Sequence, residues 1–168
     1  MAVPRITHKP AIRDAAAQVH HQMKSTGHGL VRSVAAWLAL LAMHRSRVHA
    51  ILIDTPAAQA GAAVDFWSAA LGVAARPAPG EEQFTVLSGA VPGLFAVIQS
   101  VEDAPRYHLD IETDDLAAEA ARLTALGAEP VSRWKDAYTM RAPGGHLLCV
   151  VPVHSDPETF ASSARTWQ

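Results

Sequence analysis

The chain has one cysteine, Cys149, among its 168 residues. A single thiol cannot form an internal disulfide, and such sparse use of cysteine is typical of the reducing cytoplasm. Long hydrophobic runs are also missing. The most apolar stretch, residues 34–43, has about ten residues, whereas a membrane-spanning helix needs about 20. We therefore expect a cytoplasmic protein that has no membrane-spanning helix.

Net charge is small as well, at −2, so the whole chain has no general attraction to nucleic acid. The charge is unevenly spread: residues 1–47 hold seven Lys or Arg and one acid, and the remainder holds seven basic and fifteen acidic residues. Such a break indicates a domain boundary. We expect a basic N-terminal extension over residues 1–47, helical or disordered, a globular domain over 48–153, and a tail over 154–168 that docks partly as coil.

An alternative is that the native protein starts at Met43 and that the preceding residues are upstream sequence. Arginine outnumbers lysine and alanine is abundant, which is typical of a GC-rich bacterial genome.

Two similar segments are present in the chain. His49 lies near the start of a predicted strand, Asp54 is expected to cap the helix that follows, and this helix ends at Leu71-Gly72. His108 lies in a second predicted strand, whose helix ends at Leu126-Gly127. Gly/Pro turns separate three short predicted strands after each helix. The order β-α-β-β-β therefore occurs twice, which indicates a duplicated module, with chance similarity as the alternative.

Polar side chains occupy one face of the second predicted strand. His108, Asp110 and Glu112 alternate with apolar residues, so they share a face. That face either meets solvent or lines a pocket in which His108 is a metal ligand or an acid–base group. On the first predicted strand, the same alternation places His49 on one face with Ile51.

The paired modules resemble the glyoxalase/bleomycin-resistance/extradiol-dioxygenase superfamily, also called vicinal-oxygen-chelate proteins. The residues that carry the resemblance are the helix end Phe66-Trp67-Ser68-Ala69-Ala70-Leu71-Gly72, the phrase Asp114-Asp115-Leu116 with Leu126-Gly127-Ala128, and the turn Ala142-Pro143-Gly144-Gly145-His146. The resemblance covers about residues 48–153. It implies an α+β fold in which two βαβββ modules form a cupped, mainly antiparallel sheet with helices outside, and it implies a homodimer.

The resemblance also implies candidate ligands, carried over by position as His49, Gln99, His108 and Cys149. Glyoxalase I has glutamates where Gln99 and Cys149 stand, and the dioxygenases also need a carboxylate. A divalent metal (Zn, Ni, Mn or Fe) held by His49, His108 and Cys149 is one expectation, with Asp110 or Glu112 as a substitute carboxylate. The alternative is that Cys149 is a small core residue and that His108 hydrogen-bonds to its neighbours.

Three functions remain open at this point. The first is a lyase, isomerase or dioxygenase in which His108 and His49 act on a small molecule and Gln99 is a polar contact. The second is a non-catalytic protein of the bleomycin-resistance type, whose cavity walls would be Phe95, Val97, Tyr138 and Met140. The third is an interaction protein that uses its basic N-terminal helix. The missing glutamates favour binding, and the two histidines favour chemistry.

Overall fold

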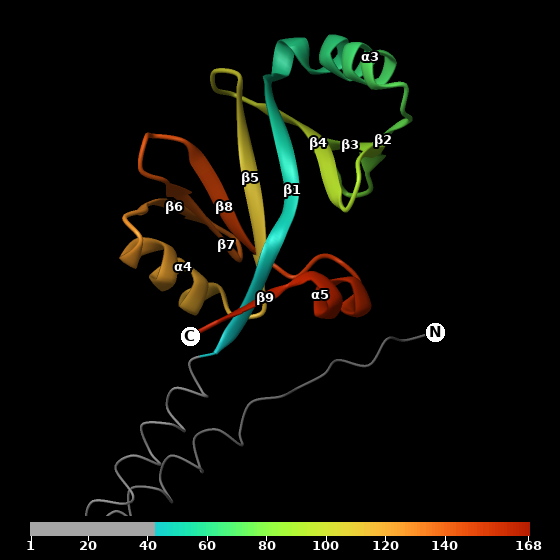
Figure 1. The fold of residues 1–168 in the computed structure, drawn as a ribbon. Coiled ribbons are helices and arrows are strands. Elements are labelled where there is room, and N and C mark those ends of the chain that lie inside the picture. Colours follow the sequence, from blue (N-terminus) through green and yellow to red (C-terminus); the bar gives the residue numbers. More distant parts are fainter. Residues whose placement is uncertain (1–42) are drawn as a thin grey trace, which may run out of the picture. The chain divides into compact units, whose positions relative to one another are not determined.

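The computed structural model describes residues 43–168, in which nine strands form one mixed sheet with three α-helices (Figure 1). Residues 1–42 of the predicted N-terminal extension lie outside the described residues. In chain order the elements are β1 His44–Pro56, η1 Ala57–Gln59, α3 Ala60–Leu71, β2 Ala75–Ala78, β3 Glu81–Val91, β4 Leu94–Val101, β5 Arg106–Thr113, α4 Leu116–Ala125, β6 Glu129–Trp134, β7 Ala137–Arg141, β8 Leu147–Pro152, α5 Pro157–Ser163 and β9 Arg165–Trp167.

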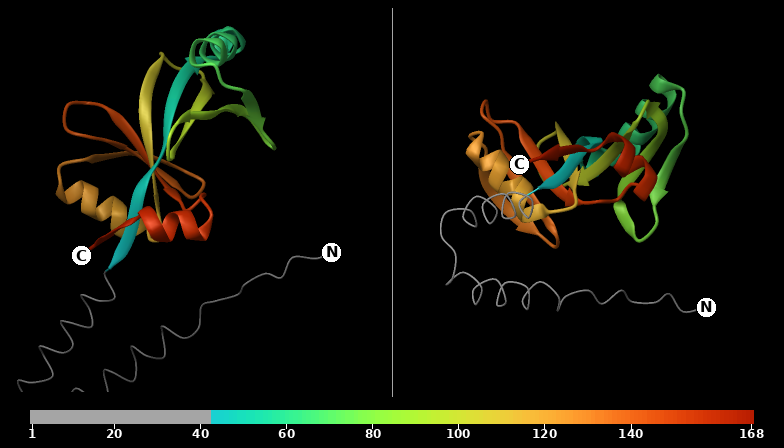
Figure 2. Two further views of the ribbon diagram at one scale, coloured as in Figure 1. Left: turned by 45° about the vertical axis from the view of Figure 1, so that its right-hand side comes forward. Right: turned by 60° about the horizontal axis from the view of Figure 1, so that its bottom comes forward.

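The sheet is built from two βαβββ modules. Its strand order, β2-β3-β4-β1-β5-β8-β7-β6, places the first strand of each module at the centre, where β1 and β5 run antiparallel. In Figures 1 and 2, β2–β4 lie on one side of this central pair and β6–β8 on the other. Only β1–β4 and β5–β8 are parallel among the pairings of the described strands. The predicted α+β fold and mainly antiparallel sheet are confirmed.

Helices α3 and α4 each pack on the outer face of one module. Leu87 and Ile98 form a buried cluster with Trp67 of α3, and Met140 and Val150 form another with Leu123 of α4. Fully burying a side chain of this size stabilises a fold by about 1.5–3 kcal/mol. The helices are outside the sheet, as predicted. No helix in residues 43–168 is long and apolar enough to cross a membrane.

The helix ends follow their sequence signals. Asp115 caps α4, because its side chain accepts hydrogen bonds from the N–H groups of Ala117 and Ala118. Gly72 and Gly127 have φ values of 65° and 98°, the left-handed conformation that favours glycine after a helix. The predicted helix ends at these glycines are therefore confirmed.

The C-terminal tail is not a coil, so that prediction was wrong. Asp156 caps helix α5, Pro157 occupies its first turn, and β9 pairs antiparallel with the start of β1. An Asp-Pro pair is a recognised helix-start signal, so the sequence did carry a signal for α5. It carries no comparable signal for β9, whose partner strand lies at the other end of the described chain.

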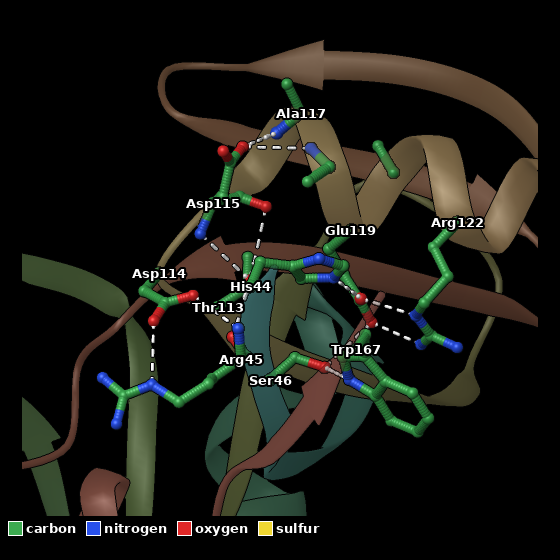
Figure 3. A network of polar contacts seen from close by, with 12 residues as sticks. His44, Arg45, Ser46, Thr113, Asp114, Asp115, Ala117, Glu119, Arg122 and Trp167 are labelled. Carbon is green, nitrogen blue, oxygen red and sulfur yellow. Dashed lines mark hydrogen bonds and ion pairs between the residues drawn. The ribbon is translucent and has the colours of Figure 1, made fainter. Parts of the chain in front are cut away.

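A buried polar network fixes β9 to the fold (Figure 3). Trp167 Nε1 donates to Ser46 Oγ at 2.7 Å, and the Arg122 guanidinium lies 4.0 Å from the Trp167 ring centre. Glu119 of α4 is fully buried and contacts His44 Nε2 at 2.6 Å. Burial alone would raise the pKa of Glu119, but its bonds to Arg122 and His44 outweigh burial and hold the pKa below its usual value. The tail is thus an integral part of the sheet.

Candidate functional site

A cavity of about 450 Å³ lies on the face of the sheet that α3 and α4 leave free. Most of its lining is apolar, and the charged or imidazole side chains that also border it are His49, Glu81, Asp110, Lys135, Asp136 and His154. The apolar walls include Leu52, Phe84, Phe95 and Val97. This size and composition are those of a site for a small molecule.

His49 enters the cavity because β1 is irregular at this point. The β1–β5 register shifts between Val48 and Ala50, so strict alternation is broken at His49. His49 therefore borders the cavity together with Ala50 and Leu52. The expectation that it shares a face with Ile51 was wrong, since a bulge can re-aim one side chain without changing the rest of the strand.

The carboxylate of Glu112, on β5, lies next to the His49 ring. The side chain of Glu112 is fully buried, and its Oε2 lies 3.2 Å from His49 Nδ1. Glu112 also accepts hydrogen bonds from the backbone N–H groups of His154 and Ser155, each at 2.9 Å. Burial would raise the pKa of Glu112, but the bonds from Ser155 and from the backbone of His154 outweigh it, so this pKa is lowered and the group is ionised at neutral pH.

The pKa of His49 itself is lowered. Burial is the main cause, and nearby His154 adds to it, while Glu112 and Asp110 act in the opposite direction. The rings of His49 and His154 lie 5.7 Å apart between centres. His49 is thus predominantly neutral at pH 7. Its Nδ1 lies near the Glu112 carboxylate but has no hydrogen-bond partner within the described chain.

His108 has a different environment. It is 9 % exposed, and its Nδ1 lies 3.0 Å from Oδ1 of the buried Asp54. Its Nε2 lies 3.4 Å from Asp110 Oδ1. Burial would lower the pKa of His108, but its contacts with Asp110, Asp54 and Cys149 outweigh burial and raise it to about 11. Without a bound cation, this imidazole is therefore positively charged at neutral pH.

Three potential metal ligands meet at His108. Ligand atoms of His108, Asp110 and Cys149 all lie within 4.8 Å of one another, and no other such group occurs within residues 43–168. Asp110 and Cys149 are register partners on the parallel strands β5 and β8. Thr139 Oγ1 lies 3.9 Å from Cys149 Sγ.

A family model described as "Glyoxalase-like domain" matches residues 50–151. The chain belongs to this family. The resemblance to the vicinal-oxygen-chelate superfamily is thereby confirmed, and its module order is the one observed here. Among curated proteins, none matches the chain.

Solved structures of methylmalonyl-CoA epimerases are similar to this chain. The enzyme from Mycobacterium tuberculosis has a TM-score of 0.46 and 18 % identity, over 68 % of this chain and 91 % of that one. A methylmalonyl-CoA epimerase in complex with methylmalonyl-CoA and NH4+ has a TM-score of 0.43 and 17 % identity, over 66 % and 96 %. The Streptomyces coelicolor epimerase in complex with 2-nitronate-propionyl-CoA has a TM-score of 0.42 and 17 % identity, over 66 % and 98 %.

The predicted site residues of this glyoxalase-like protein are only partly brought together. Phe95, Val97, Asp110 and His49 border the cavity. Four others lie close to it without forming its wall: Glu112, His108, Cys149, and Gln99, which is the register partner of Asp54. His108 and Cys149 meet, but His49 stands about three residues, or roughly 10 Å, further along the central strands.

Tyr138 and Met140 were expected as cavity walls, and the structure contradicts this. Met140 is fully buried in the cluster beneath α4, and Tyr138 packs against the same cluster. On β7 it is Thr139, register partner of Cys149, that belongs to the cavity face. Alternation showed that Tyr138 and Met140 share a face, but it could not show which face is covered by the helix.

Asp54 and His154 are the residues that sequence reasoning missed. Asp54 was expected to cap a helix, yet it lies within β1, 2 % exposed, between His108 and Arg106. An acid at the end of an apolar strand resembles a cap, so no local signal distinguishes the two roles. His154 had a clearer signal, because it lies two residues after Pro152, where the last strand of the second module ends.

Some superfamily members use a metal, and this chain has donors that fit one. The fitting set is His108, Asp110 and Cys149, since imidazole, carboxylate and thiolate are all zinc ligands. The buried Asp110 Oδ1 has no hydrogen-bond partner within the described chain. This set differs from the predicted one, because Asp110 takes the place of His49.

Proposed function

We propose that this protein binds a small molecule in the cavity and moves a proton on it, as a lyase or isomerase in which His49 is the general base. The observation that carries the proposal is the His49–Glu112 pair: a neutral imidazole at the cavity wall whose Nδ1 lies 3.2 Å from a buried carboxylate. The contact is not a hydrogen bond within the described chain. A carboxylate this close to Nδ1 nevertheless favours the tautomer with its proton there, which leaves the Nε2 lone pair to accept a proton.

The second acid–base group of the wall is Asp110. It is the register partner of Ala50, the residue next to His49. Asp110 contacts the positively charged His108, which could pass a proton to it. An isomerase needs one group to remove a proton and another to return it, and His49 and Asp110 are the two titratable groups available on the central strands.

The substrate class follows from the walls. Leu52, Phe84, Val86, Phe95 and Val97 form the apolar part of the wall, and the charged side chains of Glu81, Lys135 and Asp136 also border the cavity. We therefore expect a small carbonyl compound with an apolar body and an acidic C–H bond. A divalent cation held by His108, Asp110 and Cys149 would polarise the carbonyl oxygen when bound.

Hydrogen exchange tests the proposal directly. A panel of small carbonyl compounds is incubated with the protein in D₂O, and loss of the C–H signal is followed by NMR. We expect exchange that falls at least about 100-fold in His49→Gln, the range for a general base. His146→Gln is the matched control, because His146 is an exposed turn residue outside the cavity, and it should exchange as the native protein does. Unchanged exchange in His49→Gln would refute the role of His49.

Binding without chemistry, as in the bleomycin-resistance branch, is the second candidate. It is favoured by the absence of glutamate at Gln99 and Cys149 and by the apolar walls. In that case a compound raises the melting temperature and contacts Trp134 at the cavity wall, but its C–H bond does not exchange.

A homodimer in the cytoplasm remains part of the proposal. Tyr107 and Leu109 alternate with the cavity-side residues of β5, and their side chains are 61 % and 41 % exposed. Large exposed apolar side chains on a sheet face are a frequent feature of interfaces. Sedimentation equilibrium, with Leu109→Glu as the disrupting variant, checks the dimer. The cytoplasmic location rests on the single cysteine.

A further inference from the structure

We propose that a second pocket, formed in part by the C-terminal tail, binds a small carboxylic acid with an apolar body. This pocket has a volume of about 500 Å³, and residues of β1, α4, α5 and β9 border it. It shares no lining residue with the cavity that His49 borders. The inference therefore does not rest on the proposed function, and the two fail separately.

The pairing of β9 with β1 brings an arginine and a tryptophan to the polar start of β1. Arg165 is the register partner of Ser46, and Trp167 is that of His44. Side chains two residues apart on a strand point to the same face, so Arg165 and Trp167 share one face of β9. Trp167 Nε1 donates to Ser46 Oγ at 2.7 Å, which fixes the indole at the pocket wall (Figure 3).

Three arginines border the pocket, and carboxylates compensate two of them. Arg122 donates from Nε and Nη2 to the two oxygens of the buried Glu119, at 2.8 and 2.6 Å. Arg47 Nε lies 3.4 Å from Glu112 Oε1. Arg165 is exposed, and its side chain makes no hydrogen bond or ion pair within the described chain. One positive charge of the pocket is thus unmatched among the described residues.

Arg122 supplies a further donor that is already held in place. Its guanidinium lies over the Trp167 ring, 4.0 Å from the ring centre. Glu119 takes two of its nitrogens, and the third, Nη1, has no partner in the part of the chain that the structure describes. Guanidinium groups bind carboxylates through their planar array of N–H donors. A carboxylate in this pocket would therefore meet the unmatched charge of Arg165 and the unused donor of Arg122.

The rest of the wall determines the body of the ligand. Val48, Leu94 and Ile111 are half-buried apolar side chains that border the pocket together with the arginines. A single unmatched charge suits a monoanion, whereas a phosphate monoester carries close to two charges at pH 7 and would keep one uncompensated. The pocket therefore fits a carboxylic acid whose body is apolar.

Proton NMR titration of the full chain with hexanoate tests the site. The indole N–H signal of Trp167 reports on this pocket, and that of Trp134 reports on the other cavity. Trp167→Phe and Trp134→Phe assign the two signals. With sodium chloride holding the ionic strength constant, we expect a saturable shift of the Trp167 signal. Hexanamide has nearly the same shape but no charge, so it should bind at least about 10-fold more weakly.

Arg165→Gln should weaken hexanoate binding about 10-fold, because it removes the unmatched charge. The side chain of Arg165 is exposed, so the variant should fold, which circular dichroism checks. Arg165→Lys keeps the charge and should keep most of the affinity. Arg76→Gln is the matched control, because Arg76 is an exposed arginine on β2 outside the pocket, and it should bind hexanoate as the native protein does.

Three results would overturn the site: a Trp167 signal that does not move, equal affinity of Arg165→Gln and the native protein, or equal affinity for hexanoate and hexanamide. A shift confined to Trp134 belongs to the first of these, since it would place hexanoate in the cavity of the sheet. The hexanamide comparison needs no variant, so it decides the matter even if Arg165→Gln is unfolded.

Discussion

The two histidines on the central strands differ in charge although each contacts a buried carboxylate. His49 lies at Glu112 and has a lowered pKa, whereas His108 lies between Asp54 and Asp110 and has a pKa raised to about 11. The same residue type is therefore suited to accept a proton at one end of the site and to hold a positive charge, or to bind a cation, at the other. Proximity to a carboxylate is thus not enough to predict the charge of a histidine.

The difference lies in what else each carboxylate contacts. Glu112 accepts hydrogen bonds from Ser155 and from two backbone N–H groups, and Arg47 Nε is 3.4 Å away, so its charge is largely compensated before His49 is considered. His154 further disfavours a second positive charge there. His108 has two carboxylates, and only Asp54 shares its charge with another cation, Arg106.

The largest effect is expected from Asp54→Ala, which removes the carboxylate shared by His108 and Arg106. Removing one partner of a buried ion pair costs about 3–5 kcal/mol of folding free energy. Chemical denaturation at pH 7 measures this loss. Asp103→Ala is the matched control, because Asp103 also contacts Arg106 but is exposed, and its effect should be much smaller. Equal losses in the two variants would mean that His108 gains little from Asp54.

The pH dependence of stability separates the two histidines. Because the pKa of His108 is raised from 6.5 to about 11, its stabilising contribution is fully present below about pH 6.5 and is lost as pH rises toward 11. Unfolding free energy should therefore fall between pH 7 and 9, by up to about 1.4 kcal/mol per pH unit. His108→Gln should flatten this slope, whereas His49→Gln should not. An unchanged slope in His108→Gln would contradict the assignment.

The smallest loss of folding free energy is expected from Ser155→Ala. This variant tests whether the other hydrogen bonds of Glu112 limit its effect on the pKa of His49. The variant removes one hydroxyl donor from Glu112, at a cost of about 1 kcal/mol. With fewer competing donors, Glu112 should act more strongly on His49 and raise its pKa, which NMR titration of the imidazole measures. Ser162→Ala, whose hydroxyl bonds a helix carbonyl, is the control and should leave the pKa of His49 in place. A lowered pKa in Ser155→Ala would contradict this account.

Much of the fold and part of the candidate site could be predicted from the sequence. The helix cap Asp115 and the helix-ending glycines Gly72 and Gly127 act on neighbouring residues in the sequence. The helix ends that they predict are therefore confirmed. Phe95 and Val97, which the sequence grouped on one strand face, both border the cavity. The errors at His49 and Met140 have another origin, since a bulge and the choice of the helix-covered face depend on neighbouring strands.

The repeated order of strands and helices, and with it membership of the glyoxalase-like family, was determined by the sequence alone, because periodicity and turn residues are local properties. The pairing of each histidine with its carboxylate was decided only by the tertiary structure. His108 and Asp54 are 54 residues apart and meet because β1 and β5 pair in one particular register. A shift of that register by one residue would turn every side chain of β5 to the other face, and no short stretch of sequence encodes the register.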